Sequence, residues 1–282
     1  MSERPAPVGR LVDDLHALDR AYSMGHHGRW SGGRRAQLVD ACLRDLFAGI
    51  GPTGAFVLIA LGGYGRGMLS PGSDVDLLIL HDAARSSDVS TVAERLLYPL
   101  WDAGLSVGHA VRTADECIAV AAERLDAATA MLDGRVVAGS APEWAVVRSA
   151  VLGPIREDPR TFAERLVSDR EARRDRFGSV SSLLEPDLKE GVGGLRDVHA
   201  LGWLEVAVGR PLEESGTLRE AERRVVDEAE EFLVRSRAAL HLETGRGSDR
   251  LLLELQPAIA ADLGYADEPG LPSVDGLMRS VF

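Results

Sequence analysis

The sequence predicts an α+β protein in which a small mixed sheet with its helices comes first and an all-helical region follows. Two short apolar runs in the first third of the chain have the composition of buried strands, and a third strand-like segment follows a predicted helix. From Thr113 onwards, apolar residues recur at the three- and four-residue spacing of helices. Short strands followed by a long run of helices favour this fold class.

The N-terminal region is expected to be helical where it is ordered. Residues 1–34 mix Pro, Gly, Arg and His around an amphipathic run at Leu11, Leu15 and Leu18, which predicts a mobile or loosely docked arm. The segment Arg35 to Phe47 has apolar residues at helical spacing. It predicts a helix that packs on the region that follows.

Three strands are expected in residues 35–140, the first domain. The runs "AFVLIAL" (55–61) and "DVDLLIL" (74–80) are continuous, rich in apolar residues and bounded by turn signals, and each predicts a buried strand. A helix is expected over 88–102, and "LSVGHAVR" (105–112) predicts the third strand. Residues 141–282 form the predicted helical domain, and the helices expected after Thr113 cover 114–125, 159–177, 198–208, 218–242 and 250–263.

Composition narrows the class of protein. A formal net charge of −12 argues against a nucleic-acid partner, because phosphate-backbone binding needs a basic surface. No apolar run approaches the length that spans a membrane and no leader peptide is visible, so a cytoplasmic protein is expected. Two cysteines, Cys42 and Cys117, are too few for a disulfide framework and predict inert thiols.

The stretch "LGGYGRGMLSPGSDVDLLIL" (61–80) carries the clearest chemical signal. Side chains alternate along a strand, so Asp74 and Asp76 should point to the same side. Adjacent carboxylates repel each other, and a hard cation such as Mg²⁺ relieves that repulsion while it also binds substrate phosphates. Upstream, Gly62 and Gly63 leave room for backbone N–H groups to approach phosphate oxygens. Arg66 adds a positive charge there.

Two common nucleotide-binding loops do not fit this stretch. A Walker A loop ends in Gly-Lys-Ser/Thr, which is missing, and a dinucleotide fingerprint needs glycine where Met68 stands. An apolar strand, Gly-Gly, a ten-residue spacer and Asp-apolar-Asp do fit, and they resemble the DNA-polymerase-β-like nucleotidyltransferase superfamily. The alternative is a glycine turn beside two strand-end aspartates that only face water.

A second stretch, "EPDLKEGVGGLRDVHAL" (185–201), contains Lys189, the only lysine of the chain. By itself it fits a plain loop before a helix equally well. Taken with the first stretch and "VGHAVRTADEC" (107–117), it closely resembles the protein-PII uridylyltransferase/uridylyl-removing enzymes of nitrogen regulation. The resemblance covers most of the chain, from about Ala36 onwards.

This resemblance implies a nucleotidyltransferase domain followed by a helical domain. It implies Mg²⁺-dependent transfer of UMP from UTP to a tyrosine hydroxyl of the PII signalling protein, with release of pyrophosphate. Asp74 and Asp76 would bind the metal, and a glycine loop with free N–H groups at 191–194 would hold the triphosphate with Lys189. The nucleotide-binding residues expected are Gly62, Gly63, Gly65, Arg66, Ser73, Lys189, Gly191, Gly193, Gly194 and Arg196.

Several points stay open at this stage. The strand 105–112 has Ser106 and Gly108 where a third catalytic carboxylate is expected, so Asp133 is the substitute candidate; an acidic helix residue paired with Arg135 or solvent is the other interpretation. The family's hydrolase and glutamine-sensing ACT domains are not expected in this chain, which ends at "VDGLMRSVF".

Three other functions remain possible from the sequence. The composition, rich in Arg, Ala and Gly, suggests a GC-rich source in which relatives adenylylate PII with ATP. A glutamine synthetase adenylyltransferase has a similar lysine-glycine loop, but its strand acid is missing at Gly108. A non-catalytic nucleotide-binding regulatory module is the alternative from another class.

Overall fold

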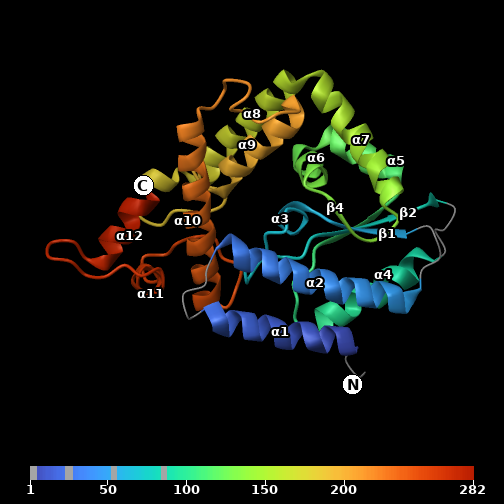
Figure 1. Cartoon of the computed structure of the whole chain (residues 1–282), viewed down its shortest axis with the longest axis horizontal. Helices are drawn as coiled ribbons and strands as arrows, with labels where there is room; N and C mark the ends of the chain where they lie inside the picture. Colours follow the sequence, from blue (N-terminus) through green and yellow to red (C-terminus); the bar gives the residue numbers. More distant parts are fainter. Residues whose placement is uncertain (1–4, 23–27, 52–55, 84–87) are drawn as a thin grey trace. The chain divides into compact units, whose positions relative to one another are not determined.

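The computed structural model describes residues 5–22, 28–51, 56–83 and 88–282, which form two compact units (Figure 1). Of the described residues, the first unit comprises 5–20, 31–51, 56–69, 73–83 and 88–154, and the second comprises 21–22, 28–30, 70–72 and 155–282. The boundary expected after residue 140 therefore lies at Pro154, inside helix α7 (Ala141–Glu157). Because a helix runs through it, no linker marks this boundary in the sequence.

A mixed four-stranded sheet in the order β3-β2-β1-β4 is the centre of the first unit. Strand β1 (Phe56–Ala60) pairs antiparallel with β2 (Leu77–His81), and β2 pairs parallel with β3 (His109–Arg112). Strands β1 and β3 lie within the predicted segments and β2 extends one residue beyond its segment, to His81; Ala55 falls outside the described residues. The α+β class with a small mixed sheet is confirmed.

The fourth strand was not predicted. Strand β4 (Arg135–Gly139) pairs antiparallel with β1, with an irregularity in the register between Leu58 and Ile59. The expectation that no strand follows Thr113 is therefore wrong. The strand lies at the edge of the sheet and is only partly buried, so its five residues show neither a continuous apolar run nor a clear alternation.

Helices cover both faces of this sheet. Helices α1 (Ala6–Tyr22), α2 (Arg29–Ile50) and α4 (Val89–Asp102) share one core with inward-facing residues of the strands, such as Leu58 and Ile79. Figure 1 shows α5 (Ala114–Glu123) and α6 (Leu125–Leu132) on the other side of the strands. Each buried leucine contributes roughly 1.5–3 kcal/mol by leaving water.

The expected N-terminal arm is a packed helix over its described part. In α1, Val8, Leu11 and Leu15 are buried in the core of the first unit, at the spacing of one helix face. The amphipathic run was therefore identified correctly, but its role was underestimated. Residues 1–4 and 23–27 of the expected arm lie outside the described residues.

The second unit is helical, as predicted. It contains α8 (Pro159–Phe177), α9 (Leu195–Val208), α10 (Glu220–Thr244), α11 (Gln256–Asp262) and α12 (Ser273–Val281). Helix α8 begins where the sequence predicts, because Asp158 caps its first turn through Thr161 N at 3.0 Å and Pro159 follows the cap. Of the expected helix 250–263, only α11 is formed. No helix in the described part of the chain is long and apolar enough to cross a membrane.

Candidate functional site

Asp74 and Asp76 stand side by side at the entrance to strand β2. Both side chains are exposed, and Val75 between them is buried. The chain is already paired there, because Val75 N donates to Ser106 O at 2.9 Å and Leu77 N donates to Gly108 O at 2.8 Å. This extended backbone places the two carboxylates on the same, solvent-facing side, as the sequence predicts.

The two predicted glycines form a single helical turn next to these aspartates. Helix α3 (Gly62–Gly65) follows β1 directly, and Gly62 has a φ of 51°, a conformation that favours glycine. A Cβ atom on Gly62 would lie 3.6 Å from Asp76 Oδ2, so the turn and the carboxylate are neighbours. The structure therefore brings Gly62 of the glycine pair and Asp76 of the aspartate pair together.

Three consecutive N–H groups of this turn are available for an acceptor from outside the protein. Within the described residues, the backbone N–H groups of Gly62, Gly63 and Tyr64 donate no hydrogen bond, whereas Gly65 N donates to Leu61 O at 2.8 Å. Unsatisfied N–H groups at the start of a helical turn attract anions. The first unit thus has N–H groups that can donate to phosphate oxygens, next to two carboxylates that can bind a metal ion.

Gly65 and Arg66, two further predicted binding residues, have other partners. A Cβ on Gly65 would lie 2.4 Å from Asp133 O, so this glycine is required for close packing of the turn against the residues before β4. Arg66 forms an ion pair with the Asp133 carboxylate. Arg66, which was predicted to bind phosphate, and Asp133, the candidate third carboxylate, thus neutralise each other's charge.

Gly108 occupies a position of the predicted strand 105–112 at which a third catalytic carboxylate was expected. A Cβ on Gly108 would lie 2.5 Å from Asp76 Oδ1, so any larger side chain here would push against that carboxylate. Gly108 directly precedes β3, and a larger residue at this position would displace the Asp76 carboxylate. Ser73, which precedes the aspartates, is half-buried in the first unit.

The donor set at the aspartates fits a hard divalent cation. Two exposed carboxylates one residue apart supply the oxygen ligands that Mg²⁺ takes from protein, with its other positions left to water and phosphate. Among the described residues no group of three or more His, Cys, Asp or Glu side chains is arranged to hold a metal ion. One histidine of the sequence, His81 at the end of β2, is followed by an aspartate; His81 Nδ1 lies 3.1 Å from Asp82 O.

Both cysteines are buried, as inert thiols should be. Burial raises the pKa of the Cys42 thiol, and likewise that of Cys117, to about 11. Neither sulfur is a thiolate near neutral pH, and neither takes part in the site.

The glycine-rich loop of the second unit differs from what its sequence predicts. Every backbone N–H from Lys189 to Asp197 already donates a hydrogen bond inside this unit. Asp187 Oδ1 accepts from Lys189 N at 3.0 Å and from Glu190 N at 2.7 Å, and Asp197 Oδ2 accepts from Gly193 N at 2.9 Å. The expectation of free N–H groups in this loop is wrong, because the loop and its own acids satisfy them.

The loop glycines serve close packing instead. A Cβ on Gly191 would lie 2.6 Å from Asp187 O, and one on Gly194 would lie 2.8 Å from Leu188 O. Gly193 has a φ of 87°. The three glycines predicted to bind a triphosphate are thus needed to fold the loop.

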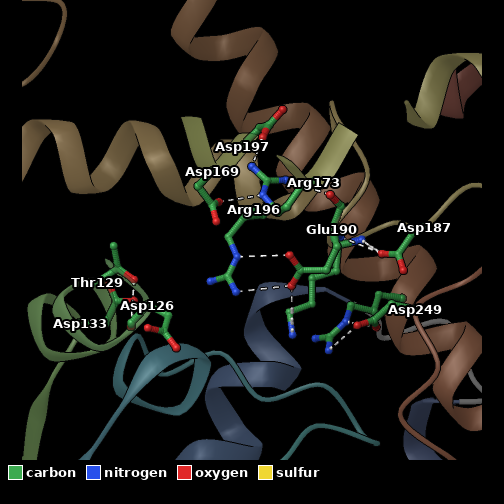
Figure 2. A network of polar contacts seen from close by, with 12 residues as sticks. Asp126, Thr129, Asp133, Asp169, Arg173, Asp187, Glu190, Arg196, Asp197 and Asp249 are labelled. Atoms are coloured by element: carbon green, nitrogen blue, oxygen red, sulfur yellow. Dashed lines mark hydrogen bonds and ion pairs between the residues drawn. The ribbon is translucent and has the colours of Figure 1, made fainter. Parts of the chain in front are cut away.

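Side chains provide the remaining positive charge of this loop. The Lys189 Nζ atom lies 3.7 Å from Glu190 Oε1, and Arg196 Nη2 lies 3.4 Å from the same oxygen. Figure 2 shows Arg196 facing Glu190 and, beyond it, Arg173 between Asp169 and Asp197. Any anion binding by the loop would therefore depend on Lys189 and Arg196 side chains.

Arg173 of α8 is buried, whereas most other charged residues of this helix are exposed. Its side chain is buried and donates to Asp169 Oδ2 at 3.0 Å, Asp197 Oδ1 at 2.6 Å and Glu190 O at 2.8 Å. Burial opposes the charge of Asp197, but the hydrogen bonds from Gly193 and from Arg173 lower the pKa of Asp197 overall. This arginine holds the start of α9 against α8.

The second unit also holds the loop segment Ser70–Gly72, which precedes the aspartates in the chain. Arg237 Nη1 donates to Ser70 Oγ at 3.0 Å, and Gly72 N donates to His241 Nδ1 at 3.1 Å. His241 Nε2 lies 3.0 Å from Asp249 Oδ1. Since Nδ1 accepts, Nε2 carries the proton and His241 is neutral; burial lowers the pKa of this imidazole, which agrees with that tautomer.

Two residues close to the glycine turn were missed from the sequence. Asp40 of α2 and Arg135 of β4 contact each other and both contact Tyr64 in the turn. An isolated aspartate in a helix and an arginine in an unpredicted strand carry no local signal. Only the structure shows that they meet behind the turn.

The second unit matches a model of the family described as GlnD PII-uridylyltransferase over residues 161–282. Relatives over most of the chain are named bifunctional uridylyltransferase/uridylyl-removing enzymes. A Streptomyces coelicolor relative is 41% identical over 253 residues, 88% of this chain. Relatives from Chromobacterium violaceum and Bradyrhizobium sp. (strain ORS 278) are 38% and 36% identical over 88% and 96% of this chain. The chain spans 28–31% of the length of these relatives.

Proposed function

Because the chain is a homologue of the bifunctional uridylyltransferase/uridylyl-removing enzymes along most of its own length, we propose that it is a nucleotidyltransferase whose nucleotide site lies in the first unit. The reaction proposed is transfer of UMP from UTP to a tyrosine hydroxyl of a PII signalling protein, with release of pyrophosphate. The observation that carries the proposal is the closeness of the Gly62 turn to the Asp76 carboxylate, which would lie 3.6 Å from a Cβ atom on Gly62.

The chain's own residues have separable roles in this reaction. The N–H groups of Gly62, Gly63 and Tyr64 would bind triphosphate oxygens, because they are adjacent donors without an acceptor among the described residues. Asp74 and Asp76 would hold Mg²⁺, which when bound lowers the pKa of the attacking hydroxyl and stabilises charge on the leaving group. The turn fixes the phosphates relative to the carboxylates, and that positioning orients the α-phosphorus for in-line attack.

A PII partner is supported by the description of the matched family, GlnD PII-uridylyltransferase, and UTP by the names of the relatives. The hydroxyl acceptor must reach the exposed side of Asp74 and Asp76, and both carboxylates face solvent. The net charge of −12 is compatible with a protein acceptor and unfavourable for nucleic acid.

The test is an assay of the purified chain with PII, Mg²⁺ and either UTP or ATP, followed by intact-protein mass measurement. We expect PII to gain the mass of one UMP per subunit with UTP and none when Asp76→Asn replaces the wild type. A gain of the mass of AMP, and none of UMP, would show that the nucleotide substrate is ATP and not UTP. Tight nucleotide binding without any gain in the mass of PII would show that the chain is a nucleotide-binding module and not a transferase.

A further inference from the structure

A buried polar cluster lies directly behind the glycine turn of the first unit. Asp40 of α2 is buried, with 6% of its surface exposed, and Tyr64 of the turn is completely buried. Tyr64 Oη donates to Asp40 Oδ1 at 2.6 Å. This hydrogen bond connects the turn to a helix that is 24 residues earlier in the sequence.

Arg135 of β4 closes the cluster from the sheet. It donates to both Asp40 oxygens, at 2.7 Å from Nη1 and 3.0 Å from Nη2, in the two-point geometry of an arginine–carboxylate pair. The same guanidinium lies 3.4 Å from the carbonyl oxygens of Tyr64 and Gly65, and 5.5 Å above the Tyr64 ring. One side chain thus contacts both the backbone and the aromatic ring of the turn.

Asp40 is the residue on which these contacts converge. Besides Tyr64 and Arg135, Arg44 donates to Asp40 Oδ2 at 3.1 Å and anchors itself on Val137 O at 3.0 Å. The carboxylate therefore accepts four hydrogen bonds and ties α2, the turn and β4 together. Removal of its charge would leave the Arg135 guanidinium short of a partner in a partly buried position, which is costly.

The free N–H groups of the turn are the reason why this cluster matters for ligand binding. Gly62 and Gly63 have no side chains that pack, and only their carbonyl oxygens are held, by Arg66 N at 3.0 Å and by Met68 N at 2.8 Å. Tyr64 is the first residue of the turn with a side chain, and it is held through Asp40. A shift of this anchor would move the three N–H groups relative to the Asp76 carboxylate.

We propose that Asp40 is a positioning residue, which with Tyr64 and Arg135 fixes the glycine turn so that its N–H groups bind the triphosphate. The proposal rests on the proposed function for the triphosphate as ligand, and it adds a residue that touches neither nucleotide nor metal. Asp40 acts through the turn: it sets how well the phosphates are held and leaves the docking of the protein acceptor unchanged.

The test compares Asp40→Asn and Tyr64→Phe with the wild type and with Asp45→Asn. Asp45 is the control because it is an acid of the same helix, is exposed and pairs with Arg10 on the surface. For each protein, calorimetry measures the affinity for Mg·UTP, steady-state assays measure KM for UTP and for PII, and thermal unfolding measures stability. The assays run well below the unfolding temperature of the least stable variant.

We expect Asp40→Asn to weaken Mg·UTP binding and raise KM for UTP by about tenfold, because a hydrogen-bonded charge is lost. KM for PII should not change. Tyr64→Phe should give a smaller effect of the same kind, since Arg135 still holds the turn, and Asp45→Asn should match the wild type. A merely structural role would lower the unfolding temperature and leave both KM values of the folded protein unchanged.

Two results would overturn the proposal in distinguishable ways. If the wild type binds and transfers the nucleotide and both Asp40→Asn and Tyr64→Phe keep its KM for UTP, the positioning role is wrong and the proposed function stands. If the wild type neither binds Mg·UTP or Mg·ATP nor transfers a nucleotide, both are wrong. If Asp40→Asn does not fold, Tyr64→Phe decides, because loss of one hydroxyl leaves the Asp40–Arg135 pair in place.

Discussion

The chain has two glycine-rich segments, and they use glycine in opposite ways. In the first unit, the N–H groups of Gly62, Gly63 and Tyr64 donate to no acceptor among the described residues. In the second unit, all nine N–H groups from Lys189 to Asp197 are used within the loop and its neighbours. A glycine-rich sequence alone therefore does not identify an anion site. What matters is whether the backbone donors are already satisfied.

The metal ligands give the largest expected effect in this comparison. Asp74→Asn and Asp76→Asn should each lower the rate of nucleotide transfer by about 10³-fold, because metal binding contributes several kcal/mol to the stabilisation of transition-state charge. Thermal unfolding should be nearly unchanged, since both side chains are exposed. Single-turnover assays at saturating nucleotide measure the effect. Asp45→Asn is the control, and full activity in Asp76→Asn would exclude the assignment of the metal site.

Matched glycine substitutions sharpen the contrast between the segments. Gly62→Ala should lower transfer by about ten- to a hundredfold, because the strain of its φ of 51° would displace the donors. Gly194→Ala should mainly lower the free energy of unfolding, by about 1–3 kcal/mol, because its Cβ would lie 2.8 Å from Leu188 O. Gly202→Ala is the control, as α9 leaves open space there. The comparison fails if Gly194→Ala is fully stable and Gly62→Ala is fully active.

Lys189 tests whether the second segment acts through a side chain. Lys189→Ala should lower transfer by about tenfold if its ammonium contacts the nucleotide, and Lys189→Arg should restore only part of this loss, because a planar guanidinium replaces a point charge. The stability should hardly change, because Lys189 is about a third exposed and its pair with Glu190 is a weak surface pair. If Lys189→Ala is as active as the wild type, the Lys189 side chain does not contribute to transfer and the loop has a structural role only.

The smallest predicted effect concerns the pH dependence of the second unit. Burial lowers the pKa of His241 in the folded state, and the imidazole faces Asp249, Arg237 and Lys189. Its contribution to stability is complete above the unfolded-state pKa of about 6.5 and is lost as the pH falls below it. Asp249 has a lowered pKa despite its burial, because of hydrogen bonds from His241 and Arg237, so its contribution is lost only at much lower pH.

Urea unfolding between pH 5 and pH 8 measures this effect. The wild type should lose stability below about pH 6.5, whereas His241→Asn, which keeps an acceptor for Gly72 N but does not titrate, should lose less. The same slope in both proteins would show that other groups cause the acid sensitivity.

The sequence was informative where one local pattern determined the structure. Alternation predicted that Asp74 and Asp76 share a side, and the apolar runs located β1, β2 and β3. The helix expected over 159–177 matches α8, whose ends are set locally: Asp158 caps the first turn, Pro159 begins the helix, and Gly178 follows its last residue with a φ of 69°. These features depend on residues that are neighbours in the chain, so they can be predicted without tertiary contacts.

The remaining features depend on partners far apart in the sequence. Strand β4 exists because β1 offers it a partner, and its own residues show no strong pattern. Asp133 was the substitute candidate for the third catalytic carboxylate, and the sequence does not show its pair with Arg66, 67 residues away. Likewise, Lys189 and its glycines suggested free donors, because the sequence does not show that Asp187 and Asp197 accept from the loop.

Residue-resolved amide hydrogen exchange, measured by NMR with and without Mg·UTP, tests the central claim most directly. In the free protein, the amides of Gly62, Gly63 and Tyr64 should exchange quickly, and those from Lys189 to Asp197 slowly, because only the latter are hydrogen-bonded. On addition of Mg·UTP, we predict that the three amides of the turn become protected while the loop of the second unit changes little. Protection that appears in the loop and not in the turn would contradict the account.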